Sequence, residues 1–504
     1  MDRCPICSIS NLAIAIKQYR KRVKKEMGKK RKDEVIVKFV SNSAVDVTGS
    51  AVLVSYLDND YLIEFGQQQG MANLEKEYAL NLQTSKNLNI DNLKCVLISH
   101  ENIDHISLIP ALYKRGFTGD TYGSFEALQF GEKLLEDCAF IINRNVQSFS
   151  KRGRKIEHIY KEEDVDTCVN HMVSRDLNRI YKFDEYMSYE FVPTNHLTGS
   201  CQIVMYIKKK SGNVVKIHYT GDLGSELGKH FGTYLRDTEI VTTSNLVISE
   251  CTYFGNPDKE FTKQDGIDER KDIKKQIWNT LHSNGKVVIP CFSMQRSQTL
   301  MLEIWRNFKD NDKFDFPVIV DSRLTKRING VFKKVLEGEQ LKEWEECLAW
   351  KNFKFVETYP DTIALISSRK PCVVITSGGM VQAGHSVDWV ASSIDCSRDL
   401  IMVVGYVPEG SILDKLLKGE KIVKWEGKTY SVRCNIKKYN TFSSHLSAKG
   451  IIKYMKQVNT GMIVFHHGSK EAKENAVKMT KEELTNIGKT TKVLASCKDM
   501  VIKL

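Results

Sequence analysis

A short segment near residue 100 gathers side chains that could bind a metal ion. His100, Asp104 and His105 follow the apolar run 95–98, which is typical of a buried strand. Imidazole nitrogens and carboxylate oxygens are the usual ligands of a catalytic zinc ion that keeps one coordination position open. Asp104 and His105 are adjacent and must point in different directions, so the set does not fit one face of a helix or strand. The alternative is a polar loop in which an Asp caps the following helix.

The neighbouring elements would place this loop at the end of a strand. Apolar and β-branched residues predict strands over 35–40, 51–56, 61–65, 189–192, 202–207 and 214–219, the second and third forming a hairpin. Helical patterns cover 74–87, 106–112 and 124–143. This alternation is typical of an α/β sandwich with ligands on loops at the strand ends.

A different pattern begins near residue 245 and ends near 435. Strands are predicted over 287–290, 318–321, 373–376 and 400–404, with helices between them, for example over 297–309. Such alternation indicates a smaller α/β domain with a parallel sheet, inserted into the larger one. Beyond it, we expect a helix over 446–457, a strand over 460–465 and a helix over 470–487.

The segment 100–105 resembles the H-x-H-x-D-H signature of the metallo-β-lactamase fold, with Asn102 in place of the second His. Segments 195–200 and 218–222 resemble the third and fourth motifs of that fold, in order. Segments 249–253, 442–445 and 464–468 resemble motifs A, B and C of the β-CASP nucleases, and 287–296, 377–380 and 404–410 resemble landmarks of the β-CASP insert. A series of motifs in the family's order is far more specific than any single one. The chain is therefore similar to the RNA-processing branch of the β-CASP family, which includes ribonuclease J and the cleavage-and-polyadenylation endonuclease.

The resemblance implies a fold class and a division of the chain. The expected fold is α/β: a metallo-β-lactamase αββα sandwich with an inserted α/β β-CASP domain. We expect a basic N-terminal extension over 1–34, the first part of the metallo-β-lactamase domain over 35–244, the β-CASP domain over 245–435, and the second part of the metallo-β-lactamase domain over 436–504.

The resemblance also implies two zinc positions. The ligands of the first would be His100, Asn102, His196 and Asp222. The ligands of the second would be Asp104, His105, Asp222 and His467. Glu64 would support these ligands where the family has an Asp. An amide oxygen is a weaker zinc ligand than imidazole, so we expect a weak first site, with Mn²⁺ as an alternative ion.

The implied reaction is hydrolysis of a phosphodiester bond by a hydroxide that the two metal ions activate. Asp104 would orient the attacking water and accept its proton. His445, held by Glu250, would protonate the leaving oxygen, because a neighbouring carboxylate raises the pKa of a His. The expected substrate contacts are Arg296, Ser377, Gly378, Gly379 and Ser444.

The substrate class depends on motif C. A His at position 467 resembles the RNA-processing members, whereas the DNA nucleases of this fold have an apolar residue there. We therefore expect a ribonuclease acting on single-stranded RNA. A DNA nuclease of the same fold remains an alternative, and so does a catalytically silent RNA-binding homologue, because Glu64, Asn102 and Ser447 depart from the family pattern.

Composition sets further limits. The 504 residues carry a formal net charge of +12, which fits a polyanionic partner. The 13 Cys are scattered, which favours a reducing compartment, and we expect a cytoplasmic protein. No apolar run reaches the ~18 residues of a membrane span, and no signal peptide is expected. Residues 20–32 contain nine Lys or Arg and could touch phosphates. The roles of Cys4 and Cys7 and the oligomeric state stay open, with a homodimer as one option.

Overall fold

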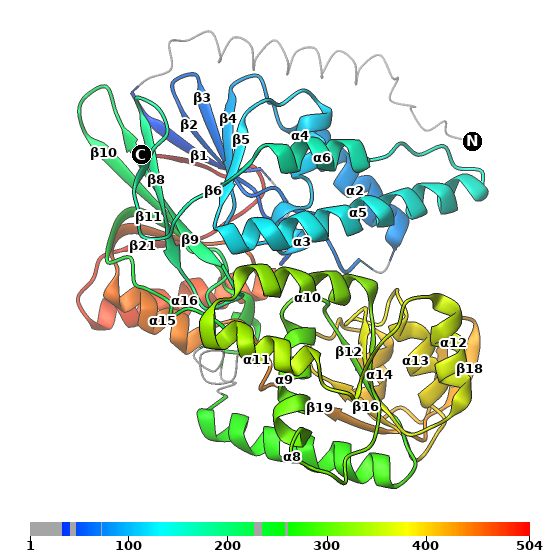
Figure 1. Ribbon diagram of the computed structural model, residues 1–504. Helices are drawn as coiled ribbons and strands as arrows, with labels where there is room; N and C mark the ends of the chain where they lie inside the picture. Colours follow the sequence, from blue (N-terminus) through cyan, green and yellow to red (C-terminus); the bar gives the residue numbers. More distant parts are fainter. Residues whose placement is uncertain (1–32, 41–46, 72, 226–233, 258–260) are drawn as a thin grey trace, which may run out of the picture.

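The computed structural model describes residues 33–40, 47–71, 73–225, 234–257 and 261–504. The basic segment 20–32, Cys4 and Cys7 lie outside this part. Two mixed seven-stranded sheets form the larger lobe, which occupies the upper half of Figure 1, and a third sheet forms the smaller lobe below it.

The first sheet has the strand order β22-β1-β2-β3-β4-β5-β6. Its strands are β1 (Val35–Phe39), β2 (Val52–Tyr56), β3 (Asn59–Ile63), β4 (Leu93–Leu97), β5 (Asp120–Gly123), β6 (Met172–Ser174) and β22 (Val501–Lys503). The predicted hairpin is β2–β3, whose strands pair antiparallel. Helices α2 (Leu74–Asn87), α4 (Ile109–Lys114), α5 (Phe125–Lys151) and α6 (Glu162–Asn170) supply the apolar side chains on its outer face.

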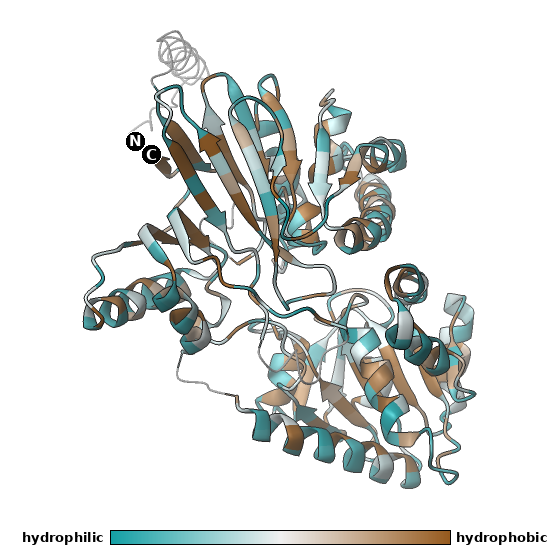
Figure 2. Ribbon diagram, turned by 60° about the vertical axis from the view of Figure 1, so that its left-hand side comes forward, coloured by the Kyte–Doolittle hydropathy of each residue, from teal (hydrophilic) through white to brown (hydrophobic). Residues whose placement is uncertain are grey.

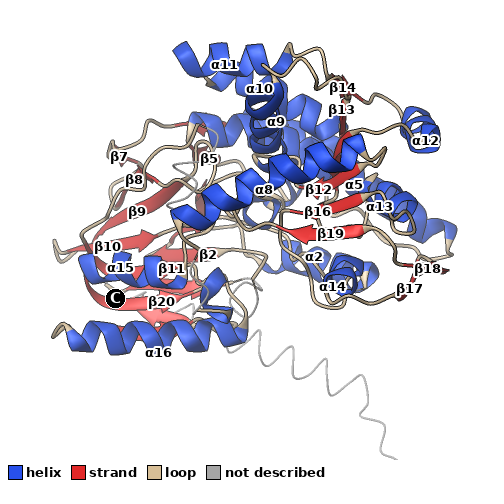
Figure 3. Ribbon diagram, turned by 90° about the horizontal axis from the view of Figure 1, so that it is seen from below, coloured by secondary structure: helices blue, strands red, loops and turns tan. Residues whose placement is uncertain are grey.

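The second sheet has the order β21-β20-β11-β10-β9-β8-β7. Its strands are β7 (Tyr181–Lys182), β8 (Met187–Pro193), β9 (Cys201–Lys208), β10 (Val214–Tyr219), β11 (Thr243–Ser249), β20 (Asn459–Phe465) and β21 (Lys492–Ala495). Helices α15 (Ala448–Gln457) and α16 (Lys470–Asn486) cover its outer face, as Figure 3 shows.

Alternation of side chains along the strands explains why these sheets stack. Val52 and Val54 belong to the core between the two sheets, whereas Leu53 belongs to the core under the helices, because successive side chains of a strand point to opposite faces. Figure 2 shows these strands as the most hydrophobic part of the larger lobe. The larger lobe is the αββα sandwich that the sequence predicts.

The smaller lobe contains a parallel six-stranded sheet with the order β14-β13-β15-β12-β16-β19. Its strands are β12 (Val287–Cys291), β13 (Val318–Asp321), β14 (Phe353–Phe355), β15 (Val373–Ser377), β16 (Leu400–Val403) and β19 (Asn435–Lys438), beside a β17 (Ile422–Trp425)–β18 (Lys428–Ser431) hairpin. Helices α8 (Lys263–His282), α9 (Arg296–Phe308), α10 (Arg323–Val335), α11 (Gly338–Leu348), α12 (Tyr359–Ser368), α13 (Ser386–Ser393) and α14 (Ile412–Leu417) complete this lobe. Apolar cores lie on both faces of its sheet.

Three details differ from the sequence expectations. The helix expected over 106–112 is two short helices, α3 (Ile103–Ile106) and α4, since Pro110 lies in the first turn of the second. Helix α5 continues to Lys151, eight residues past its expected end. The expected domain junctions at 244/245 and 435/436 fall inside β11, which pairs with the larger lobe, and at the start of β19, which pairs with the smaller one.

In the part of the chain that is described, no helix is long and apolar enough to cross a membrane.

Candidate metal centre and active site

The predicted site residues meet at one edge of the sandwich. Strands β10, β11 and β20 are parallel, so their carboxyl ends share an edge. Asp222 follows β10, Glu250 follows β11 and His467 follows β20. His196 follows β8, which runs in the same direction as β10 because each is antiparallel to β9. The loop after β4 adds His100, Asp104 and His105, so the topology itself assembles the cluster.

Asp222 lies at the centre of this cluster. Its Oδ2 atom is 3.6 Å from His100 Nε2, 3.5 Å from His196 Nε2 and 3.6 Å from His105 Nε2. All four side chains are buried. Within the described residues, His100 Nε2, His196 Nε2 and Asp222 Oδ1 have no hydrogen-bond partner. Buried polar atoms normally have such a partner. These three atoms therefore fit the role of ligands to a metal cation.

The protonation of two of the imidazoles, His100 and His196, agrees with this fit. His196 Nδ1 donates to the carbonyl oxygen of Ser444 over 3.1 Å, which leaves its Nε2 with a lone pair. Burial lowers the pKa of His196 to about 4, and burial also holds the pKa of His100 well below its usual range. Neutral imidazole is the metal-binding form of His, so both rings are ready to act as ligands.

A second group of ligand atoms adjoins the first. His467 Nε2 is 3.2 Å from Asp104 Oδ2 and 3.1 Å from His105 Nε2, and His467 Nδ1 is 3.8 Å from Asp222 Oδ1. The ligand atoms of Asp104, His105 and His467 lie within 4.8 Å of one another, as do those of His100, His196 and Asp222. Asp222 therefore contacts both groups, which correspond to the two zinc positions expected from the sequence.

Asn102 lies between these ligands in the chain. It is the half-buried N-cap residue of α3, and its side chain makes no capping hydrogen bond. Its carbonyl oxygen accepts from the backbone N–H of His105 over 2.9 Å. Its role as a metal ligand stays a prediction.

Glu64 holds the ligand His105 from behind. Its fully buried carboxylate accepts hydrogen bonds from His105 Nδ1 over 2.7 Å, from the Tyr219 hydroxyl over 2.5 Å and from the Ser99 hydroxyl. A carboxylate bonded to Nδ1 fixes the ring and directs Nε2 toward the cluster. Glu64 has a φ of +60°, a conformation that L-residues adopt at a cost. Sequence reasoning missed Ser99 and Tyr219, although both adjoin recognised motifs.

His445 and Glu250 form a pair at the edge of the cluster. His445 Nδ1 lies 3.1 Å from Glu250 Oε2, and its ring centroid is 4.6 Å from that of His196. Burial alone would lower the pKa of His445, but the charge of Glu250 and its hydrogen bond outweigh it and raise the pKa to about 9. The imidazole can therefore hold a proton at neutral pH.

Four of the five expected substrate contacts come from the smaller lobe, and Ser444 lies in the larger lobe. The guanidinium of Arg296 donates to the carbonyl oxygen of Val404 over 3.0 Å and has no carboxylate partner within the described residues. Gly378 has a φ of +98°, and a Cβ there would lie 2.2 Å from the Ala383 oxygen; a Cβ on Gly379 would lie 3.3 Å from the backbone nitrogen of Phe292. These glycines let the turn after β15 pack against the end of β12. Ser444 contributes its carbonyl group to His196 rather than a side-chain contact.

Gln295 connects the two lobes, which the sequence did not predict. Its side-chain oxygen accepts hydrogen bonds from the backbone N–H and the hydroxyl of Thr198, over 3.2 and 3.0 Å, two residues after His196. Its backbone has φ +59° and ψ −51°, and the N–H of Arg296 donates to the carbonyl of Met294 over 2.6 Å. This is a γ-turn with positive φ, a rare and strained conformation. No local sequence pattern indicated this turn or its hydrogen bonds to Thr198.

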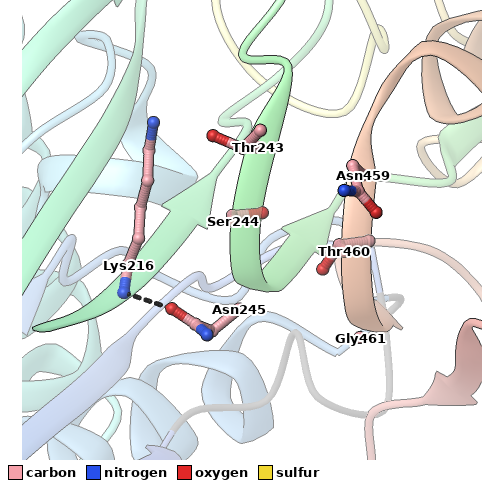
Figure 4. A pocket seen from close by; sticks show the side chains of 7 residues that line it. All are labelled: Lys216, Thr243, Ser244, Asn245, Asn459, Thr460 and Gly461. Atoms are coloured by element: carbon pink, nitrogen blue, oxygen red, sulfur yellow. Dashed lines mark hydrogen bonds between the residues drawn. The ribbon is translucent and has the colours of Figure 1, made fainter. Parts of the chain in front are cut away.

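A polar hollow of about 290 Å³ lies elsewhere in the larger lobe. Figure 4 shows its lining, which includes Lys216, Thr243 and Asn459. These residues lie at or near the starts of β10, β11 and β20, whereas the metal ligands follow their ends, about 20 Å away along the strands. The hollow is therefore separate from the candidate active site.

Comparison with known proteins agrees with this arrangement. The family model described as "Beta-Casp domain" matches residues 297–416, and the model described as "Zn-dependent metallo-hydrolase RNA specificity domain" matches residues 429–492. Residues 297–416 therefore resemble the β-CASP domain of metallo-β-lactamase-fold hydrolases, and the segment that follows resembles their RNA specificity domain. The fold class that the motifs predict is confirmed, and the segment that matches the Beta-Casp model lies in the smaller lobe.

Several curated proteins are similar to this chain over most of its length. Integrator complex subunit 11 of Danio rerio is 25% identical over 432 residues, covering 85% of this chain and 68% of the relative. Transcription termination factor FttA of Methanocaldococcus jannaschii is 25% identical, covering 75% of this chain and 59% of the relative. Ribonuclease TTHA0252 of Thermus thermophilus is 23% identical, covering 85% and 92%. A solved structure of a protein of unknown function from Enterococcus faecalis V583 has the same fold, with a TM-score of 0.52 at 14% identity, over 94% of this chain and 100% of that one.

Proposed function

We propose that this protein is a metal-dependent ribonuclease that hydrolyses phosphodiester bonds of single-stranded RNA. The observation that carries the proposal is the contact of one buried carboxylate, Asp222, with both groups of ligand atoms, next to the His445–Glu250 pair. A match to an RNA specificity domain and a relative named as a ribonuclease support RNA as the substrate.

The cluster would hold two Zn²⁺ ions, with Mn²⁺ as the alternative. The residues for the first are His100, His196 and Asp222, with Asn102 beside them. The residues for the second are Asp104, His105, Asp222 and His467. When bound, such ions lower the pKa of a coordinated water and neutralise charge on the phosphoryl oxygens.

The chain's own residues supply the proton transfers. Asp104 retains partial contact with solvent, with 15% of its side chain exposed, so it can orient a water molecule and accept a proton from it. His445, kept protonated by Glu250, can donate a proton to the leaving oxygen of the RNA. Arg296 carries an uncompensated positive charge at the lobe junction, which suits a phosphate of the substrate.

Cleavage of labelled oligonucleotides tests this function. Purified protein with Zn²⁺ or Mn²⁺ should cleave single-stranded RNA and leave DNA of the same sequence intact. Asp222→Ala should lose all activity while keeping its circular dichroism spectrum, because it removes the carboxylate that both groups share. Asp176→Ala, which alters a carboxylate with 78% side-chain exposure, is the matched control and should cleave as the wild type does.

The outcomes separate the alternatives. Cleavage of DNA alone would identify a DNA nuclease, and RNA binding without cleavage in either metal would identify a silent homologue. Full activity in a folded Asp222→Ala protein would contradict the site assignment. A cytoplasmic location and a homodimer stay predictions that localisation and light scattering can test.

A further inference from the structure

Three large aromatic side chains are exposed near the junction of the lobes. Tyr253 is 40% exposed, Phe292 43% and Tyr406 67%. Each follows a different strand: Tyr253 lies three residues after Glu250, Phe292 directly follows β12, and Tyr406 lies three residues after β16. Single exposed aromatics are ordinary, so their meaning depends on whether they converge.

Contacts place the first ring beside the proposed proton donor. The Tyr253 ring centroid is 5.8 Å from that of His445, at an interplanar angle of 77°. Its hydroxyl bonds the hydroxyl of Ser443, which holds the ring at motif B. Tyr253 also lies within electrostatic range of the Arg296 guanidinium.

Contacts bring the other two aromatic residues close to Arg296. Phe292 Cε2 lies 3.9 Å from the position of a Cβ on Gly405, the neighbour of Tyr406. The guanidinium of Arg296 bonds the carbonyl of Val404, two residues before Tyr406, and the carbonyl of Phe292 accepts the N–H of Ser297 over 3.2 Å. The three aromatic residues and the guanidinium of Arg296, which has no carboxylate partner among the described residues, therefore lie on neighbouring segments close to His445.

This combination suits an unpaired nucleic-acid strand. Every base has a π-face, so aromatic rings bind successive bases without regard to sequence. The guanidinium adds charge for the phosphates between them. Bases inside a duplex are already stacked on their neighbours and present no free face.

We propose that Tyr253, Phe292 and Tyr406 form a stacking platform for the unpaired bases that flank the scissile phosphate. The platform rests on the proposed ribonuclease function and makes it specific for single-stranded RNA. It limits cleavage to unpaired segments through stacking rather than through reading of base edges.

The test couples two of the three side chains, those of Phe292 and Tyr406, to a base, and leaves Tyr253 in place because its ring lies beside that of His445. The cleavage site of a 12-nucleotide RNA is mapped with the wild-type holoenzyme, and the same RNA is made with abasic ribose on either side of that site. Values of kcat/KM are then measured for wild type, Phe292→Leu and Tyr406→Leu, since Leu keeps apolar volume without a π-face. Phe140→Leu is the matched control, because Phe140 is 41% exposed on α5, away from these rings.

We expect each variant to lose about 5- to 100-fold in kcat/KM on intact RNA, the range for one stacked base. The wild type should lose a similar factor on abasic RNA, and the variants should lose nothing further there. Phe140→Leu should match the wild type on both substrates. The platform is overturned if the variants lose equally on intact and abasic RNA, or lose nothing on either. A wild type that cleaves no RNA would instead overturn the proposed function, and the platform with it.

Discussion

Among single residues, Asn102 offers the clearest test of the metal site. It lies between His100 and Asp104 where the family signature has a second His, and its side chain makes no capping hydrogen bond. Its Cα position is fixed by the bonds that its carbonyl accepts from α3. An imidazole at this position would therefore be added to a preformed ligand set.

We expect Asn102→His to raise zinc affinity by about 10- to 100-fold, the scale of changes around a metal site. Competition with a chromophoric chelator, on wild type and variant side by side, measures both stoichiometry and affinity. Asn102→Ala serves as the control and should bind zinc no more tightly than the wild type. If wild type and Asn102→His both retain two ions equally tightly, Asn102 is not a deficient ligand.

His445 is expected to act on the proton of the leaving group without holding the metal. His445→Ala should reduce kcat about 100- to 10,000-fold, the contribution of a general acid, with zinc content unchanged. Glu250→Gln should give part of this loss, because it removes the charge that keeps His445 protonated. Single-turnover cleavage and elemental analysis measure the two quantities. Loss of zinc from His445→Ala would mean that the imidazole is a ligand instead.

Among the structural elements, the strands bring the metal ligands together. One glycine allows the segment after β3 to pack closely against the segment that carries Asp104 and His105. Gly66 lies shortly after β3 and packs against helix α3. A Cβ added to Gly66 would lie 1.8 Å from the carbonyl oxygen of Asp104. The same carbonyl accepts the N–H of Ser50 over 2.7 Å. The backbone at Asp104 is therefore held tightly by Gly66 and Ser50.

Gly66→Ala should displace Asp104 and His105, abolish tight zinc binding and cost about 1–3 kcal/mol, as overpacking does. Urea unfolding and zinc titration measure both effects. Gly330→Ala is the matched control: no heavy atom outside its own helix α10 lies within 4 Å of the added Cβ, so stability should rise by up to about 1 kcal/mol. Wild-type zinc affinity in Gly66→Ala would contradict this role.

Much of this arrangement was predictable from sequence. The apolar, β-branched run of β2 and the apolar runs of the smaller lobe are local sequence patterns, and the ligand types depend on motifs. The bonds of Glu64 to Ser99 and Tyr219 were not predictable, because they join residues up to 155 positions apart. The packing of the inserted domain against the larger lobe was not predictable either. It determines the hydrogen bond of Gln295 between the lobes and the proximity of Tyr253, Phe292 and Tyr406.

For the whole molecule, the buried ligand cluster links metal binding to folding. Asp222 and the facing imidazoles lose water on folding, and a cation that binds only the folded state stabilises it. Zinc at 100 times its dissociation constant should contribute about 2.7 kcal/mol, which should raise the melting temperature of a chain of this length by about 2–3 °C. Differential scanning calorimetry with EDTA and with excess zinc measures the shift. Asp222→Ala should show none, and an equal melting temperature for the wild type in both buffers would argue against a bound metal.

The strained turn at Gln295 links the two lobes through the hydrogen bonds of its side chain. Because its amide oxygen accepts the N–H of Thr198, the loop that carries His196 has this contact with the smaller lobe only while the lobes are closed. Moving the lobes apart to admit an RNA strand would break this hydrogen bond and let the turn relax. Full catalytic activity would therefore return only when the lobes close again. The catalytic residues would then be fully positioned only in the closed arrangement of the two lobes. Gln295→Met, which keeps the length but lacks the acceptor, should speed hydrogen exchange at the Thr198 amide while exchange in the core strands β10 and β11 stays as in the wild type.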